Sequence, residues 1–199
     1  MAVDNFELIC EIIRKRNLTE DEFFFLQVIK RKKDNPDVGM SHEIVIHNWF
    51  IKDADYLMEK KDAIIKMCED NNARAYFRLN KRSYKKVALQ TLALIAQNIA
   101  SGNYNIKNCY ESCAGQHHAE TDEKTWVLDF DYGESEITDE MWRVLHDLVV
   151  ETKRAPICHT LPTKNGYHVI CPPFNIKKFQ DKFGNISYHR DNPTILYIP

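Results

Sequence analysis

Short strand-like segments alternate with helix-like segments in the last third of the chain, and this pattern constrains the fold more than any other feature. The strand-like segments are short, apolar and bounded by turn residues, whereas the helix-like segments carry apolar residues at helical spacing. The predicted strands are 126–131, 155–160, 167–171 and 194–198, and the predicted helices are 138–152 and 177–183. Because both kinds of segment are mixed within one compact region, we predict an α+β fold.

Helical periodicity dominates the first hundred residues. Phe6, Ile9 and Ile12 share one helix face, and Thr19 followed by Glu22 is typical of the capping box at a helix start. The predicted helices are 4–16, 20–33, 55–70 and 84–100, and the predicted strands are 43–51 and 73–79. We therefore expect a helical N-terminal region over residues 1–70, packed on a sheet-based core over residues 71–199.

Bulk composition narrows the class of protein. The chain has 199 residues, which suffice to bury the core of one domain. Its formal net charge of −2 excludes an overall basic surface, so nucleic-acid contacts would have to come from local patches. The longest apolar-rich segment, 87–100, is too short to cross a membrane, and the N-terminus lacks the pattern of a secretory signal. We expect a cytoplasmic protein without a membrane partner.

Two aspartates form the strongest chemical signal in the sequence. Asp129 and Asp131 lie two residues apart on a predicted strand, so both carboxylates point to the same side, while Phe130 faces the core. Two carboxylates held close together repel each other unless a cation lies between them, and a hard divalent ion supplies that charge. The alternative is a strand that ends in a solvated acidic turn.

The segment 163–169 is the second signal. Asn165-Gly166 is a strong turn signal between two strand-like runs. Tyr167 and Val169 share one side of the following strand, which leaves His168 on the other side, where the strand can pair beside Asp129. A histidine next to carboxylates and Lys164 is suited to a phosphate-binding pocket. The alternative is a hairpin with an incidental surface histidine.

The third signal is weaker and precedes the last predicted strand. Asp191 could add a third carboxylate, and His189 or Arg190 could contact a phosphate. An ordinary polar turn before Pro193 explains the same residues.

Taken in order, these motifs resemble those of the archaeo-eukaryotic primase superfamily, which includes primases and primase–polymerases. Its first motif is similar to residues 128–131 (LDFD), and its second motif is similar to residues 163–168 (TKNGYH). Its third motif, an acidic residue, corresponds to Asp191. The second motif departs from the common pattern because Gly166 stands where a serine is usual, and Thr163 is the nearest hydroxyl.

The resemblance implies a helix-rich N-terminal unit packed on an RRM-like, split β-α-β catalytic sheet. It implies a DNA primase or polymerase type of nucleotidyltransferase, with nucleic acid and nucleoside triphosphates as ligands and a helicase or other replication protein as a further partner. Asp129, Asp131 and Asp191 would hold two Mg²⁺ or Mn²⁺ ions. His168 would act with these carboxylates and bind the nucleotide. The remaining nucleotide-binding residues would be Thr163, Lys164 and Asn165.

A basic and aromatic segment around 74–86 is a candidate nucleic-acid path. Its cations would neutralise phosphates while neighbouring rings stack on bases. The candidate residues are Arg74, Arg78, Lys81 and Arg82. The alternative is a solvated edge whose aromatic side chains face the core.

Cys109, Cys113, His117 and His118 lie within ten residues and suggest a zinc site. Their spacing does not match structural zinc motifs, and adjacent histidines seldom bind one ion, so we expect no structural zinc.

Two other functions remain open at this stage. The first is a catalytically inactive module of the same fold that binds nucleic acid or nucleotide. The second is a phosphatase of the haloacid-dehalogenase type, which also carries an Asp-x-Asp motif. Gly133 stands where that class has threonine or valine, and the motif lies late in the chain, so the sequence disfavours the phosphatase.

Overall fold

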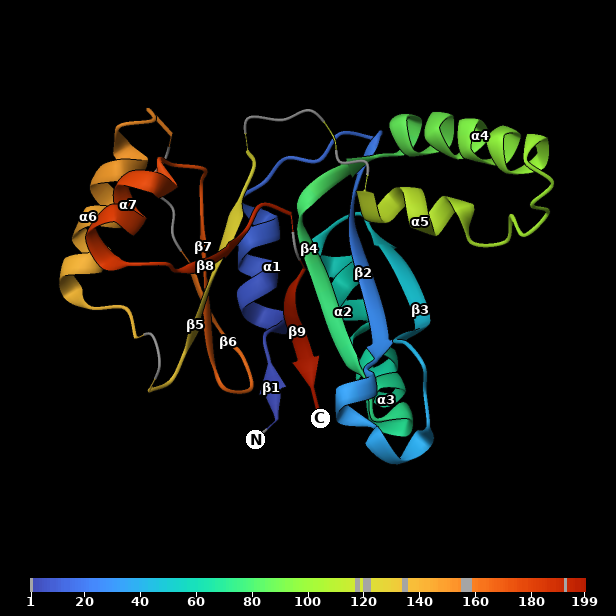
Figure 1. Cartoon of the computed structure of the whole chain (residues 1–199), viewed down its shortest axis with the longest axis horizontal. Coiled ribbons are helices and arrows are strands. Elements are labelled where there is room, and N and C mark those ends of the chain that lie inside the picture. The colour runs from blue at the N-terminus through green and yellow to red at the C-terminus, as the bar shows by residue number, and fades with distance from the viewer. Residues whose placement is uncertain (1, 117–118, 120–122, 134–135, 155–158, 192) are drawn as a thin grey trace.

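The computed structural model describes residues 2–116, 119, 123–133, 136–154, 159–191 and 193–199. Within these residues lie seven α-helices and two antiparallel sheets, which confirms the α+β class. Figure 1 shows the two sheets side by side, with helix α1 (Phe6–Arg14) between them. The buried face of α1 includes Phe6, Ile9 and Ile12, as their spacing predicted.

The first sheet has the strand order β1-β9-β4-β2-β3, and each neighbouring pair is antiparallel. Its strands are β1 (Val3–Asp4), β2 (Glu22–Lys30), β3 (Ile44–Ile51), β4 (Arg74–Ser83) and β9 (Thr194–Ile198). The first and last strands of the chain pair with each other, so both termini lie at the same end of the molecule (Figure 1).

Several helices accompany this sheet. The predicted helix at 55–70 is two helices that meet at Lys60, α2 (Ala54–Glu59) and α3 (Lys61–Asn71). Two short 3-10 turns, η1 (Lys32–Asp34) and η2 (Pro36–Val38), connect β2 to β3. α4 (Tyr84–Ala100) and α5 (Cys109–Gln116) form a hairpin that projects from the end of β4 (Figure 1).

The second sheet has the strand order β6-β7-β5-β8. Its strands are β5 (Trp126–Asp131), β6 (His159–Pro162), β7 (Gly166–Cys171) and β8 (Ser187–His189). Helices α6 (Asp139–Val150) and α7 (Ile176–Phe183) cover its outer face, where they pack on Leu128, Phe130 and Val169 (Figure 1). The chain order β5-α6-β6-β7-α7-β8 is that of a split β-α-β unit.

The prediction of a helix at 20–33 is wrong, because most of this segment is β2. Phe23 and Phe25 pack toward α4 and α5, while Phe24 and Leu26 pack into the core on the other face. A strand buried on both faces loses the alternation that identifies strands, and its continuous apolar run can be taken for a helix. The Glu22 carboxylate accepts a hydrogen bond from the Thr19 amide at 3.1 Å, so the expected helix cap is instead a turn before the strand.

The prediction that residues 194–198 complete the split β-α-β unit is also wrong. The fourth strand of the unit is β8, which pairs with β5, whereas β9 lies between β1 and β4 in the first sheet. All five residues of β9 are buried, as suits an interior strand. The first sheet thus contains strands from both sides of the predicted boundary at residue 70, since β2 and β3 precede it and β4 and β9 follow it.

One core joins the two sheets. It contains Phe6 and Ile9 of α1, Phe77 of the first sheet, and Val127 and Ile170 of the second sheet. The inner face of the second sheet is therefore buried along part of its length and carries the candidate site along the rest.

Candidate active site

The pairing of β5 with β7 places Asp129 directly opposite His168. This confirms that the two strands are neighbours. Leu128 and Phe130 pack against the α6 and α7 side of the sheet, so Asp129 and Asp131 both face the other side. On the outer side, the Phe130 and Tyr167 rings stack with their centroids 5.5 Å apart. The alternation of both strands thus places the polar side chains inward, as predicted.

His168 is held between two partners. Its Nε2 lies 3.4 Å from Asp129 Oδ1, and its Nδ1 lies 2.8 Å from the hydroxyl oxygen of Thr194 on β9. A carboxylate only accepts hydrogen bonds, so a neutral ring that donates from Nε2 to Asp129 would accept from the Thr194 hydroxyl at Nδ1. The side chains of His168 and Asp129 are 14% and 38% exposed, so the pair is open to solvent on the carboxylate side.

The electrostatics of the site favour an ionised Asp129. The hydrogen bond from His168 lowers the pKa of the Asp129 carboxyl below its ordinary value, against the effect of partial burial, and electrostatic attraction to His168 and His189 lowers it further. Asp129 is therefore a carboxylate at neutral pH, as cation binding requires.

The sequence-based prediction missed Ser187 and Thr194 at this site and named His189 only as a phosphate contact. Ser187 lies directly opposite Asp129 on β8, and His189 lies opposite Val127 on the same strand. Thr194 reaches His168 from the other sheet. β8 spans only three residues, so its alternation is too short to recognise in a sequence.

Gly166 lies opposite Asp131, where β5 and β7 approach each other closely. A Cβ added at Gly166 would overlap the Phe130 carbonyl oxygen and lie 2.8 Å from the Asp131 Cα. Glycine is therefore the residue that permits this pairing at the end of the site.

The predicted turn at Asn165-Gly166 is confirmed, since the Thr163 amide donates to the Gly166 carbonyl at 2.9 Å. The Asn165 carbonyl accepts a hydrogen bond from the Tyr132 amide, which ties the turn to the end of β5. Lys164 lines a separate cavity together with Arg74, away from the pair of Asp129 and His168.

Asp191 has partners of its own. Both of its carboxylate oxygens accept hydrogen bonds from Arg82, at 3.2 and 2.8 Å, and one also accepts from Asn80 at 3.0 Å. The Arg82 side chain is fully buried. These contacts favour a structural role for Asp191 over that of a third metal ligand.

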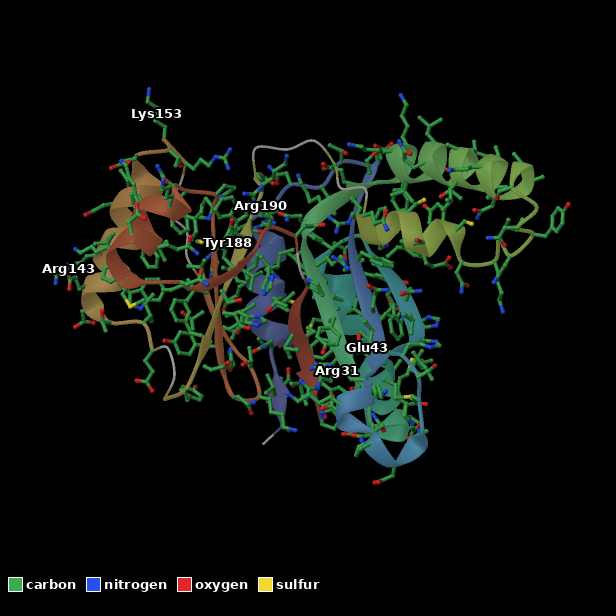
Figure 2. All side chains as sticks on the ribbon, in the orientation of Figure 1. Arg31, Glu43, Arg143, Lys153, Tyr188 and Arg190 are labelled. Carbon is green, nitrogen blue, oxygen red and sulfur yellow. The ribbon has the colours of Figure 1, made fainter. Side chains whose placement is uncertain are left out.

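The neighbouring Arg190 packs on two aromatic rings. Its guanidinium carbon lies 5.6 Å from the centroid of Trp126 and packs beside Tyr188, as Figure 2 shows.

The four candidate nucleic-acid residues on β4 all have protein partners. Arg74 pairs with Asp34 at 2.6 Å, and Arg78 donates to the Asp191 carbonyl at 2.7 Å. Lys81 lies 3.2 Å from Glu22 and 3.1 Å from Glu123, and Arg82 pairs with Asp191. All four cations are largely buried, and three of them pair with carboxylates within 3.2 Å. These contacts favour a structural role for this segment, which is not the solvated edge of the alternative either.

The carboxylates of the site fit a divalent ion whose coordination shell is completed by the phosphates of a substrate. Across the part of the chain that the structure describes, no three His, Cys, Asp or Glu side chains form a group that could hold a metal ion. Mg²⁺ in enzymes that act on nucleotides is commonly held by a few carboxylates together with substrate phosphates and water. Asp129 and Asp131 on one face of β5 supply such carboxylates, so they fit a metal bound together with a phosphorylated ligand.

The cysteine–histidine segment lies partly outside the described residues, since these do not include His117 and His118. Cys109 and Cys113 lie on α5 as buried free thiols, and Cys113 packs in the cluster of Phe23 and Phe25. Both therefore pack in the interior as small apolar side chains do.

Comparisons of the chain with protein-family models, with curated proteins and with solved structures found no match. Among the described helices, none is long and apolar enough to cross a membrane.

Proposed function

We propose that this chain is a metal-dependent nucleotidyltransferase of the primase–polymerase type, with its active site on the inner face of the second sheet. The observation that carries the proposal is the pair formed by Asp129 and His168 across β5 and β7. The strand order β6-β7-β5-β8, with α6 and α7 on the opposite face, supports an RRM-like catalytic sheet of the kind that the motifs imply.

Each residue of the site has a separate role in this proposal. Asp129 and Asp131 would hold Mg²⁺ or Mn²⁺ at the open end of β5, and such an ion, when bound, stabilises charge on transferring phosphates. His168 donates from Nε2 to a phosphate oxygen of the incoming nucleoside triphosphate, in competition with Asp129. Thr194 fixes the ring from the other side, so the donor is oriented before the nucleotide binds.

In this proposal, Asp191 is a positioning residue. Its ion pair with the buried Arg82 joins the β8–β9 connection to β4, and Thr194 follows only three residues later. The ion pair thus holds the start of β9, from which Thr194 reaches His168.

A second candidate function is a binding module that has this fold without catalysis. Ser187 favours this function, because a hydroxyl rather than a carboxylate lies opposite Asp129 on β8. With Asp191 bound to Arg82, the site offers Asp129 and Asp131 as its metal-binding carboxylates. Such a module would bind nucleotide and metal without turnover.

Nucleotide incorporation with Mn²⁺ tests the proposal. The assay compares primed and unprimed templates for the wild type, for the double variant Asp129→Ala/Asp131→Ala, and for Asp147→Ala as a matched control. Asp147 is an exposed acid on α6, with a side chain that is 79% exposed. We expect activity in the wild type and the control and none in the double variant. Nucleotide binding without incorporation in all three proteins would support the inactive module instead.

A further inference from the structure

A second cavity, of about 380 Å³, lies away from the candidate active site. It is formed where the end of α1 and the turn after α6 meet the start of β5, the start of β6 and the end of β7. Its basic lining residues are Lys15, Arg16, Lys124, Lys153, Arg154 and His159. Asp129, Asp131 and His168 do not line it.

The charge of this cavity is strongly one-sided. Among the lining residues that the structure describes, five lysines and arginines and His159 accompany one acidic side chain, Glu123, whose carboxylate also lies 3.1 Å from Lys81 Nζ. Cations placed together in a concave site raise the local concentration of anions and focus the electric field. The cavity is thus suited to a ligand with more than one negative charge.

Two arginines in the cavity are partly or wholly removed from water. Arg154 Nη1 is buried and has no hydrogen-bond partner. Arg154 is only partly exposed among the lining residues, and a cation held away from bulk water interacts more strongly with an anion. Arg16 donates through Nη1 to the Leu79 carbonyl, which holds its guanidinium in place. Burial lowers the pKa of Arg16, so an anion beside it would also stabilise its charged form.

The cluster is more than a set of cations at helix ends. Lys15 follows α1 and Lys153 follows α6, where the helix dipole attracts cations. Lys124 and His159, however, come from segments next to β5 and β6, and no helix ends at either of them. Burial lowers the pKa of His159, and the positive charges of Lys15 and Arg16 lower it further, against the opposing effect of Glu11.

Lys153 lies in the turn that ends α6 and has a left-handed backbone conformation. Its φ angle is +59°, a left-handed conformation that glycine adopts more easily than lysine. Figure 2 shows Lys153 extending outward from the turn that follows α6. Its exposed side chain lies at the rim of the basic cavity.

The remaining wall of the cavity is apolar and includes Ile12, Ile170 and Pro172. Known ligand pockets range from about 300 to 1,000 Å³ and combine apolar walls with a few polar anchors. We propose that this cavity binds a nucleoside di- or triphosphate, with its phosphates on the basic residues and its base against the apolar wall. The site is additional to the proposed active site and does not require that site to be catalytic.

Binding of fluorescent MANT-ATP in EDTA tests this proposal, because chelation removes the metal that the aspartates would use. The variant Lys15→Glu/Lys153→Glu changes two exposed rim cations, so the fold should be preserved. The matched control is Lys107→Glu/Lys177→Glu, with the same charge change at two exposed lysines outside the cavity. We expect binding at least about tenfold weaker in the rim variant and unchanged in the control, since each lost phosphate contact costs roughly that factor.

Two further variants are informative. One distinguishes the loss of charge from a loss of folding, and the other distinguishes binding in this cavity from binding in the proposed active site. Lys153→Gly removes the charge and relaxes the backbone, so it should weaken MANT-ATP binding without lowering the melting temperature. Asp129→Ala/Asp131→Ala should bind MANT-ATP in EDTA as the wild type does. Equal binding by the rim variant and its control, or loss of binding only in the aspartate variant, would overturn the proposal.

Competition identifies the ligand class. Unlabelled ATP should displace MANT-ATP more effectively than inorganic triphosphate, because the apolar wall contributes to ATP alone, and adenosine should not displace it. Displacement by triphosphate as strong as by ATP would overturn the assignment to a nucleoside phosphate.

Discussion

His168 of the second sheet and Thr194 of the first sheet share a hydrogen bond of 2.8 Å between Nδ1 and the hydroxyl oxygen. Thr194 is fully buried, so this contact joins the two sheets at the edge of their common core. It orients the imidazole whose other nitrogen lies near Asp129. The candidate site therefore depends on how the two sheets are placed relative to each other.

Thr194→Val tests this dependence. The substitution keeps the side-chain shape but removes the hydroxyl, which leaves Nδ1 without its partner, and we expect nucleotide incorporation to fall about tenfold, as after the loss of one hydrogen bond in a buried site. Thr194→Ser should retain most activity. The ¹⁵N shifts of the His168 ring should report a changed tautomer balance in the valine variant only. Identical ring shifts in both variants would show that Thr194 does not orient His168.

Stability should depend on pH through Asp129. Its pKa is lowered in the folded state, so its ionised form stabilises the fold at pH values above the unfolded pKa of about 4. This contribution is lost as the pH falls below that value and through the lower folded pKa. We expect Asp129→Asn to be less stable than the wild type at pH 7, with the difference shrinking toward pH 3 in urea titrations. A difference independent of pH would contradict the pairing with His168.

The ion pair of Arg82 and Asp191 should matter for stability more than for metal binding. Removing one partner of a buried ion pair costs about 3 kcal/mol or more, so both Arg82→Met and Asp191→Asn should be destabilised. The double variant should be less destabilised than the sum of the two, as a double-mutant cycle by urea unfolding would show. Loss of Mn²⁺-dependent incorporation in Asp191→Asn at unchanged stability would instead identify Asp191 as the third metal ligand.

Gly166→Ala should destabilise the protein by about 1–3 kcal/mol, because the added methyl group overlaps the backbone of β5 and forces the strands apart. Gly115 on α5 provides the matched control, since a Cβ there meets nothing within 4 Å. Gly115→Ala should be neutral or stabilising by up to about 1 kcal/mol. Thermal unfolding of both variants checks the prediction, and equal melting temperatures would show that β5 and β7 tolerate a side chain at Gly166.

Local patterns identified much of the second sheet before the structure was known. Alternation along 126–131 placed Asp129 and Asp131 on one side and Phe130 on the other, and the structure confirms this. The turn at Asn165-Gly166 is confirmed. The helix predicted at 138–152 is observed as α6, and the Thr138 hydroxyl caps its start by accepting from the Met141 amide at 3.2 Å. These features depend on residues that are neighbours in sequence, so the sequence alone suffices to predict them.

Tertiary structure decided the features that depend on distant residues. β2 was predicted to be a helix because its two faces are buried by different parts of the chain, which hides its alternation. Asp191 pairs with Arg82, 109 positions away, and Arg74 and Lys81 on β4 also pair with carboxylates that are distant in sequence. Lys15, Lys124 and His159 come together in the basic cavity from three separate segments. The sequence determined which side chains share a strand face, whereas only the packing of the two sheets decided which charges meet, because no local spacing encodes contacts between distant segments.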